Sequence, residues 1–337
     1  MDRNQFESYL KEDNVTEKFL HMEKGELQNA FGEEFLKTVD YGDQNNNSHQ
    51  YDLFEHILRT VDNVGTQNLN GEDLLKVKIA AFFHDIGKPS VAQLNEKTGQ
   101  TQFIGHAKES AILAEGILAN LGYSKNEINE LSFLIKCHDD FINISKIEDV
   151  TPNRVAKVFA SINKKTEEYP PKLSDMKKLI ALCEADAMAQ NDVIMKNGEI
   201  FDTKQNRIAR LEAINQVLEE AVVLKQNQEI EKMQKQIETI ENGPKPIEKN
   251  GKIVNQKQID LWNAKTEEQK QSEINEINNK IQLAEEEKAR ILENEDNKEK
   301  QDSKHKEKAE RLTTSMEESK KLGEEIKELS KDNEQNK

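Results

Sequence analysis

Cysteine and tryptophan are scarce in this sequence, and an excess of basic residues is absent. The chain of 337 residues contains two cysteines and one tryptophan, and its net charge is −16. Cys137 and Cys183 both fall within apolar helical patterns, so we expect two reduced core thiols and no disulfide framework. The negative net charge argues against a protein that coats nucleic acid by charge alone, although it leaves room for a local basic patch.

The sequence also lacks the long apolar runs that would place it in a membrane. No run approaches the ~18 apolar residues of a membrane-spanning helix. The first residues, MDRNQFESYLKED, contain no apolar stretch of the kind that a signal peptide needs. We therefore expect a soluble, cytoplasmic protein with no membrane partner.

Aromatic residues almost disappear in the last part of the chain. After Phe201 the only aromatic residue is Trp262, whereas Lys, Arg, Asp and Glu become dense. A segment so poor in large apolar groups cannot build a globular core of its own. We therefore expect the hydrophobic core to lie before Phe201.

Before Phe201 the sequence is typical of consecutive helices. Apolar residues recur at helical spacing, and Ser124 with Glu127 predicts a capping box at the start of one helix. Alternation typical of a β-strand occurs only around Thr101–Ile104. An all-α fold is therefore predicted. Besides the helix that Ser124 caps, the predicted helices are residues 52–64, 72–83, 106–121, 152–162 and 172–190.

The charged segment after residue 208 predicts two helices that face each other. Apolar residues step by three and four in both arms, and Gly243 and Pro244 separate the arms. These steps predict an antiparallel coiled-coil hairpin. Beyond about residue 294 the chain is nearly all charged and amide residues, which indicates either a solvated helix or a disordered end. The predicted seam residues are Ile230, Met233, Ile237 and Ile240 in the first arm and Ile274, Ile277, Ile281 and Ala284 in the second.

Two polar residues that can bind metal, His84 and Asp85, directly follow the apolar run 79–83. A single buried histidine is more often a satisfied core residue, but here the anomaly repeats. His56 interrupts the apolar face of one predicted helix, and Asp186 lies on the inner face of another. No Lys or Arg lies within four residues of Asp186, so a cation from elsewhere must offset its buried charge.

Two further histidines, His106 and His138, fall at the ends of predicted core helices. Each has a second reading, because His106 can be a water-exposed first residue of a helix and His138, followed by Asp139, a solvated helix end. The joint pattern is more specific than either residue. Imidazoles and carboxylates together suit Mn, Fe, Zn or Ni better than Ca.

The order His56, then His84-Asp85, then Asp186 resembles the signature of the HD metal-dependent phosphohydrolase superfamily. Around these residues, SHQYDLFEH, HDIGKP, FIGH and EADAMAQN resemble the HD domain of bacterial CCA-adding tRNA nucleotidyltransferases. The resemblance covers about residues 25–225. The residues before it contain no Gly-Ser loop and carboxylate pair of a nucleotidyltransferase head, so we expect no nucleotide addition.

The resemblance implies a role for each residue of this set. His56, His84, Asp85 and Asp186 would hold one divalent ion (Mn, Fe, Ni or Mg), and Asp85 would bridge to a second ion. His106 and His138 would hold that second ion. Asp85 and Lys88 are the expected catalytic residues. Lys88 would neutralise a phosphate oxygen, and the alternative is that it is an ordinary exposed lysine. Arg154 is a weaker candidate for binding substrate phosphate, because an ordinary surface residue is the favoured interpretation there.

The implied function is that of a metal-dependent phosphatase or phosphodiesterase, acting on a phosphomonoester or phosphodiester of a nucleotide or RNA end. The alternative is an HD-fold scaffold that binds a nucleotide or RNA and uses its coiled coil to join a protein partner or a second copy. The intact ligand set favours the enzyme. The expected segments are an N-terminal extension (1–24), the HD domain (25–203), the coiled-coil hairpin (204–295) and a charged tail (296–337).

Overall fold

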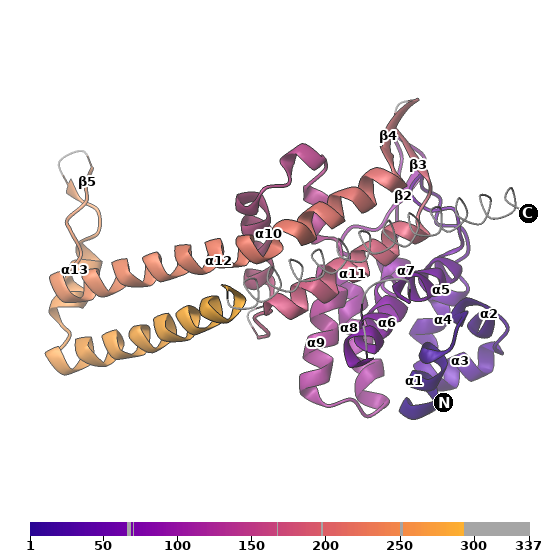
Figure 1. Ribbon diagram of the computed structural model, residues 1–337, viewed down its shortest axis with the longest axis horizontal. Coiled ribbons are helices and arrows are strands. Elements are labelled where there is room, and N and C mark those ends of the chain that lie inside the picture. The colour runs from indigo at the N-terminus through magenta and orange to yellow at the C-terminus, as the bar shows by residue number, and fades with distance from the viewer. Residues whose placement is uncertain (66–68, 70, 167, 197, 250–251, 293–337) are drawn as a thin grey trace, which may run out of the picture. The chain divides into compact units, whose positions relative to one another are not determined.

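The computed structural model describes residues 1–65, 69, 71–166, 168–196, 198–249 and 252–292 (Figure 1). The chain divides into two compact units, Met1–Lys225 and Gln226–Lys337. In the described residues, strands occur only as three two-stranded antiparallel ribbons. The prediction of an all-α fold is therefore confirmed. The predicted tail at residues 296–337 lies outside the described residues.

The first unit is a bundle of short helices interrupted by two small ribbons. Its helices are α1 (Arg3–Lys11), α2 (Val15–Leu20), α3 (Lys24–Phe31), α4 (Glu33–Val39), α5 (Leu53–Val64), α6 (Gly71–Phe83), α7 (Lys88–Val91), α8 (His106–Asn120), α9 (Lys125–Cys137), α10 (Pro152–Lys165), α11 (Leu173–Ala189) and the start of α12 (Lys204–Asn242). The 3-10 turns η1 (Asp140–Asn143) and η2 (Ile147–Asp149) follow α9, and the strands are β1 (Gln93–Asn95), β2 (Gln100–Gln102), β3 (Val193–Lys196) and β4 (Glu199–Thr203).

Helix α6 is the centre of the first unit. It packs against α5, α9 and α11, and every residue from Val77 to Phe83 is buried. Helix α5 covers it with an apolar stripe that includes Ile57, Leu58 and Val61, all fully buried. Because the C-terminal half of α6 is buried, the chain that leaves the helix at Phe83 emerges inside the protein.

The four N-terminal helices close the core around Phe82 of α6. The ring of Phe82 lies 5.1 Å from that of Phe6, 4.9 Å from Phe19, 5.3 Å from Phe31 and 5.4 Å from Phe35, measured between centroids. Such aromatic contacts bury large apolar areas. Residues 1–24, expected as an extension, thus contribute Phe6 and Phe19 to the core that holds α6 in place.

The local predictions hold with small shifts. The capping box of Ser124 and Glu127 is confirmed at the start of α9, and the strand expected around Thr101–Ile104 is β2. Helix α10 continues three residues past its predicted end because the chain to Lys165 contains no Gly or Pro. Thr166 then closes it by donating from both its amide N–H and its hydroxyl to the carbonyl of Ile162.

The second unit contains a helical hairpin. The end of α12 is followed by β5 (Glu248–Lys249), β6 (Lys252–Ile253), α13 (Gln256–Asn263) and a helix at residues 267–292 that runs back along α12 (Figure 1). Nζ of Lys288 donates to Oδ1 of Asn227 at 2.8 Å. The predicted seam residues are less exposed than most of their neighbours on both arms. A supercoil of these arms stays a prediction.

Within the described residues, no helix has the length and apolar character needed to cross a bilayer.

Candidate metal centre

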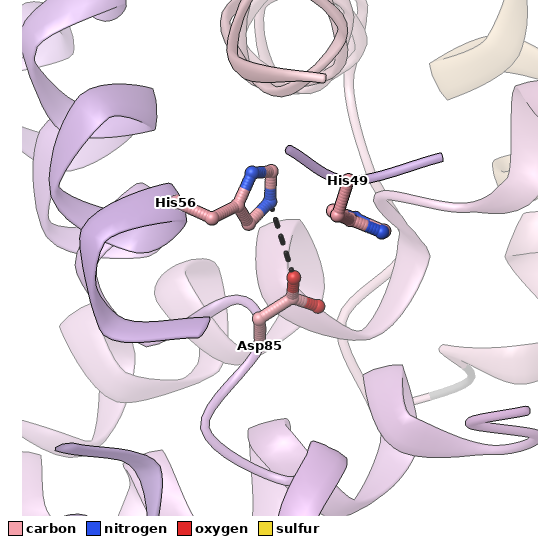
Figure 2. A group of neighbouring side chains, drawn as sticks. All are labelled: His49, His56 and Asp85. Atoms are coloured by element: carbon pink, nitrogen blue, oxygen red, sulfur yellow. Dashed lines mark ion pairs between the residues drawn. The ribbon is translucent and has the colours of Figure 1, made fainter. Parts of the chain in front are cut away.

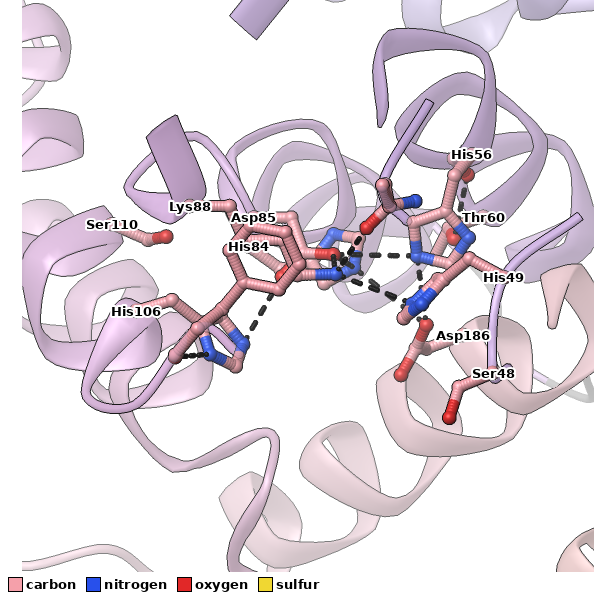
Figure 3. Close-up of polar contacts among 12 residues, drawn as sticks. Ser48, His49, His56, Thr60, His84, Asp85, Lys88, His106, Ser110 and Asp186 are labelled. Carbon is pink, nitrogen blue, oxygen red and sulfur yellow. Dashed lines mark hydrogen bonds and ion pairs between the residues drawn. The ribbon is translucent and has the colours of Figure 1, made fainter. Parts of the chain in front are cut away.

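Five segments of the first unit bring the six predicted metal ligands to one place, and Figure 3 labels all of them except His138. His56 comes from the middle of α5, His84 and Asp85 from the chain leaving α6, and Asp186 from α11. His56 and His84 are fully buried, Asp85 is 2% exposed, and the side chain of Asp186 is 14% exposed. His106 joins them from the start of α8, and His138, the residue that caps α9, completes the set.

One side of the Asp85 carboxylate faces the first group of ligands. Oδ2 of Asp85 lies 3.3 Å from Nε2 of His56 and 3.2 Å from Nε2 of His84. The same two nitrogens lie 3.0 and 3.7 Å from Oδ1 of Asp186. Two imidazole nitrogens and two carboxylate oxygens therefore converge on one small volume.

The other oxygen of Asp85 faces the second group. Oδ1 lies 3.1 Å from Nε2 of His106 and 3.7 Å from Nε2 of His138. The carboxylate of Asp139, which the sequence pattern did not single out as a ligand, lies 3.3 Å from the His106 nitrogen and 3.6 Å from that of His138. Asp85 thus presents one oxygen to each group.

Backbone carbonyls orient three of these imidazoles. Nδ1 of His84 donates to the carbonyl of Ala81 at 2.7 Å, and Nδ1 of His138 donates to that of Ile135 at 2.7 Å. His106 does the same with Phe103 at 2.8 Å. Because a carbonyl only accepts, Nδ1 must carry the proton in each ring, so in the neutral ring Nε2 keeps a lone pair that faces the carboxylates. This tautomer is the one that binds metal through Nε2.

A close backbone contact joins the two groups. The amide N–H of Gly87 donates to Oγ of Ser110 at 2.9 Å, which ties the turn after His84-Asp85 to α8. A Cβ at Gly87 would lie 2.4 Å from the amide nitrogen of Ser110 and 2.8 Å from Glu109. Only glycine permits this approach, so the packing of His84-Asp85 against the helix of His106 depends on it.

Several buried polar atoms of the centre have no hydrogen-bond partner among the residues that the structure describes. They are both ring nitrogens of His56, Nε2 of His84, Oδ1 of Asp85 and Oδ1 of Asp186. Leaving such atoms unsatisfied costs free energy that a folded protein normally avoids. Within the group of His56, His84 and Asp186, and within the group of His84, Asp85 and His138, the ligand atoms all lie within 4.8 Å of one another. A divalent cation fits this donor set and satisfies these atoms.

The charged groups of the centre shift one another's pKa values in the direction opposite to the effect of burial. Burial disfavours the charged form of His84, but Asp85 and Asp186 outweigh it and raise the pKa of His84 to about 10. Burial likewise opposes ionisation of both carboxylates, but the imidazoles, together with Lys88 beside Asp85, hold the pKa of each well below its usual range. The carboxylates therefore stay ionised and require positive charge between them, from protons on imidazole or from a metal.

Lys88 is part of the centre. It is 3% exposed, so the alternative reading of Lys88 as an ordinary exposed lysine is wrong. Nζ lies 2.6 Å from Oδ2 of Asp85 and 2.8 Å from Oε1 of Gln44. Nζ also lies 3.2 Å from Nε2 of His49. The ammonium group is therefore held against the carboxylate that faces both groups of ligands.

His49 was missed as a candidate, although it stands in the segment that carries the resemblance. Its ring lies 4.6 Å from that of His56, and His49, His56 and Asp85 form a further trio within reach of one cation (Figure 2). Nδ1 of His49 lies 2.8 Å from Oδ1 of Asn46. Burial lowers the pKa of His49 well below its ordinary value, so the ring is neutral.

A cavity of about 740 Å³ opens onto the centre. Asp85, Asp186 and Lys88 line it, and so do cations that sequence reasoning missed, Arg207 and Lys146. Arg154, the predicted phosphate-binding residue, does not line this cavity. It is exposed in the first turn of α10, where its amide N–H donates to the hydroxyl of Thr151. Further lining residues are Ile104, Ile142, Phe103, Phe141, Phe201 and Arg210.

Comparison with known proteins identifies the region around this centre. Residues 53–189 match the family model of the HD domain. A CC-adding tRNA nucleotidyltransferase of Thermus thermophilus is 32% identical over 92 residues, which are 27% of this chain and 21% of the relative. An A-adding tRNA nucleotidyltransferase of Deinococcus radiodurans is 30% identical over 90 residues, which are 27% of this chain and 20% of the relative. The chain spans about a fifth of the length of these curated relatives, and the predicted resemblance is confirmed.

Proposed function

Residues 53–189 form an HD domain, and from this premise we propose that the chain is a metal-dependent phosphohydrolase. Its substrate is a phosphomonoester or phosphodiester of a nucleotide or an RNA end. The observation that carries this proposal is the set of buried, unpartnered nitrogen and oxygen atoms around Asp85, beside a cavity large enough for such a ligand.

The proposed ligand roles follow the two oxygens of Asp85. His56, His84, Asp85 and Asp186 would hold one divalent ion, and the second oxygen of Asp85 would share another ion with His106 and His138. Asp139 lies close enough to belong to this second group. A bound divalent ion supplies a Lewis acid for a phosphoryl oxygen and lowers the pKa of a water ligand toward ~7.

The remaining polar residues would position the substrate. Lys88 holds the Asp85 carboxylate at 2.6 Å and lines the cavity, so its ammonium can also offset charge on a phosphoryl oxygen. The hydrogen bonds from His84, His106 and His138 to backbone carbonyls keep the three rings in a fixed orientation. Such fixed side chains lose little freedom when a ligand binds.

The substrate class is supported by two observations. The curated relatives carry tRNA nucleotidyltransferase names, which makes a nucleotide or RNA end a natural ligand for the shared region. The cavity also combines cations with apolar side chains, as a ligand with both a phosphate and a base requires.

A second candidate function is a nucleotide- or RNA-binding scaffold. The hairpin of the second unit favours it, because Leu261 and Leu283 there are 58% and 65% exposed. Exposed apolar side chains of this kind can dock a protein partner or a second copy. In this reading the HD domain binds its ligand without hydrolysing it.

A substrate screen separates the two functions. The full chain is loaded separately with Mn, Ni, Co and Mg and assayed on p-nitrophenyl phosphate, bis-p-nitrophenyl phosphate and 2′,3′-cyclic nucleotides. Asp85→Asn is the matched control, because it removes a charge from both ligand groups with little change in size. We expect turnover of at least one ester class that Asp85→Asn abolishes. Ligand binding without turnover under every metal would favour the scaffold.

A further inference from the structure

Arg207, in the first turn of α12, is a buried cation that forms no ion pair with any of the described residues. The residue is 8% exposed, and it lines the cavity that contains Asp85 and Asp186. Nη2 of Arg207 donates to the backbone carbonyl of Asn191, whereas Nε and Nη1 are buried with no hydrogen-bond partner. Within the described residues, two of its three guanidinium nitrogens therefore lack a hydrogen-bond partner from the protein.

The carboxylates nearest to Arg207 in sequence are engaged by other cations. Asp202 accepts hydrogen bonds from Nη1 and Nη2 of Arg210 at 3.1 and 2.6 Å, and Asp192 pairs with Lys204 at 2.7 Å. In the part of the chain that the structure describes, no carboxylate forms an ion pair with Arg207. A buried guanidinium without compensation carries a desolvation cost, which an anion from outside the chain would offset.

We propose that Arg207 binds a phosphate oxyanion of the ligand that occupies this cavity. Guanidinium groups bind phosphate oxygens with several directed, charge-assisted hydrogen bonds. The carboxylates of Asp85 and Asp186 repel an anion, and the positive charge of Arg207 offsets that repulsion from within the same cavity. This inference rests on the proposed function in one respect: the proposed function identifies the anion as the phosphate group of an ester.

Apolar side chains beside this cation suit the rest of such a ligand. Phe201, Ile104 and Ile142 all line the cavity and are 60%, 78% and 72% exposed. Phe201 belongs to β4, the strand that leads directly into the helix of Arg207. An organic group attached to the phosphate can cover these side chains while Arg207 holds the oxyanion. The ligand class is therefore a phosphate ester with an apolar, flat group rather than inorganic phosphate alone.

The test measures phosphate binding separately from catalysis. Full-length protein loaded with Mn is titrated calorimetrically with inorganic phosphate and with a nucleoside monophosphate. Arg207→Gln should weaken both affinities roughly 10- to 100-fold, the usual effect of losing hydrogen bonds to a charged group. Bound Mn should stay at the wild-type level. Arg59→Gln, which removes a half-buried guanidinium that does not line the cavity, is the control and should bind phosphate as the wild type does.

Arg207→Lys guards against a folding defect, because it keeps the charge and loses part of the directed bonding. It should bind phosphate with intermediate affinity. Wild-type phosphate affinity in both Arg207 variants, with normal thermal melting, would overturn the proposal. Failure of the proposed function has a different signature: the wild type would hydrolyse no ester, yet its phosphate affinity would still depend on Arg207. If the protein hydrolyses an ester but its phosphate affinity does not depend on Arg207, the proposed function stands and only this inference is wrong.

Discussion

Nε2 of His56 lies 3.0 Å from Oδ1 of Asp186, although the two residues stand near opposite ends of residues 53–189, the stretch that matches the HD domain model. They belong to α5 and α11, which pack directly against each other. Neither helix carries a binding site alone, so this pair of ligands exists only in the folded domain. A cation bound there therefore stabilises the packing of α5 on α11 as well as the ligands themselves.

Replacing Asp186 by Ala should lower the bound metal and abolish ester hydrolysis. The fold should survive, because the substitution also removes a buried charge whose partners are the imidazoles and the side-chain amide of Gln190, which donates to Oδ2 of Asp186 at 3.0 Å. Elemental analysis, paired with a turnover assay and a circular dichroism spectrum, checks all three expectations. Full metal content with full activity would show that Asp186 is not a ligand.

His106→Ala and His138→Ala probe the second group of ligands. Each should remove at most one ion and leave the ion held by His56, His84 and Asp186 in place, because Oδ2 of Asp85 faces His56 and His84 while Oδ1 faces His106 and His138. Metal-to-protein ratios of the two variants check this. Loss of all bound metal from either variant would mean that the two groups form a single site.

Metal affinity should rise with pH between about 6 and 9. Burial lowers the pKa of His84 in the metal-free protein, but Asp85 and Asp186 outweigh burial and raise this pKa to about 10. A proton therefore occupies this ring below that pH, and a metal must displace it. The affinity should increase by up to about tenfold per pH unit for each proton displaced. Competition with a chelating dye at several pH values measures it, and a flat profile contradicts the assignment of His84.

Glu184→Gln should stabilise the metal-free protein at pH 8 and have no effect at pH 4. Burial, with some repulsion from Glu212, raises the pKa of Glu184 to about 7. Below pH 4 the carboxyl is protonated in the folded and unfolded states alike. As the pH rises the unfolded state ionises first, so the folded state loses stability up to about pH 7 and keeps that deficit above it. Partial exposure limits the gain at pH 8 to about 1 kcal/mol.

Thermal melts in the presence of EDTA at the two pH values test this prediction. Glu212→Gln is the matched control, since it removes the repulsion and leaves the burial of Glu184 unchanged. Its gain at pH 8 should be smaller than that of Glu184→Gln. Equal gains at pH 4 and pH 8 would show that the effect is one of packing and not of ionisation.

Truncation after Lys225 should leave turnover of a small ester within a few-fold of the full chain. The boundary between the two compact units falls there, and all residues proposed for the metal centre precede it. Kinetics on p-nitrophenyl phosphate, with melting curves for both proteins, make the comparison. A collapse of activity in a truncated protein that melts normally would show that the hairpin influences the active site.

The sequence predicts the centre well where a helix positions the ligand. His56 and Asp186 interrupt regular apolar stripes, and His84 follows an apolar run, so periodicity alone indicates that they are buried. His49 lies in a loop whose path depends on side-chain bonds such as that of Asn46, and no period reveals it. Arg207 is buried at the start of α12, where its guanidinium donates to the carbonyl of Asn191, and no apolar period of the sequence reveals that burial.

The N-terminal helices were also hard to predict. Helices α1 and α2 are short and offer few apolar positions, among them Phe6, Leu10 and Phe19, so the helical period is weak there. Their burial depends on Phe82, a residue far away in the chain. Local helix propensity does not depend on such distant contacts and therefore cannot predict them. The capping box at Ser124 and Glu127 is entirely local and was predicted correctly.

The contact between Gly87 and the start of α8 has a consequence for how the two ligand groups tolerate mutation. Their spacing is set by backbone meeting backbone, with no room for a methyl group at Gly87. Side-chain substitutions elsewhere in the core can therefore change the metal affinity of either ligand group while the distance between the two groups stays constant. A methyl group added at Gly87 would instead push His84-Asp85 away from the helix of His106, and the second group would lose its contact with Oδ1 of Asp85.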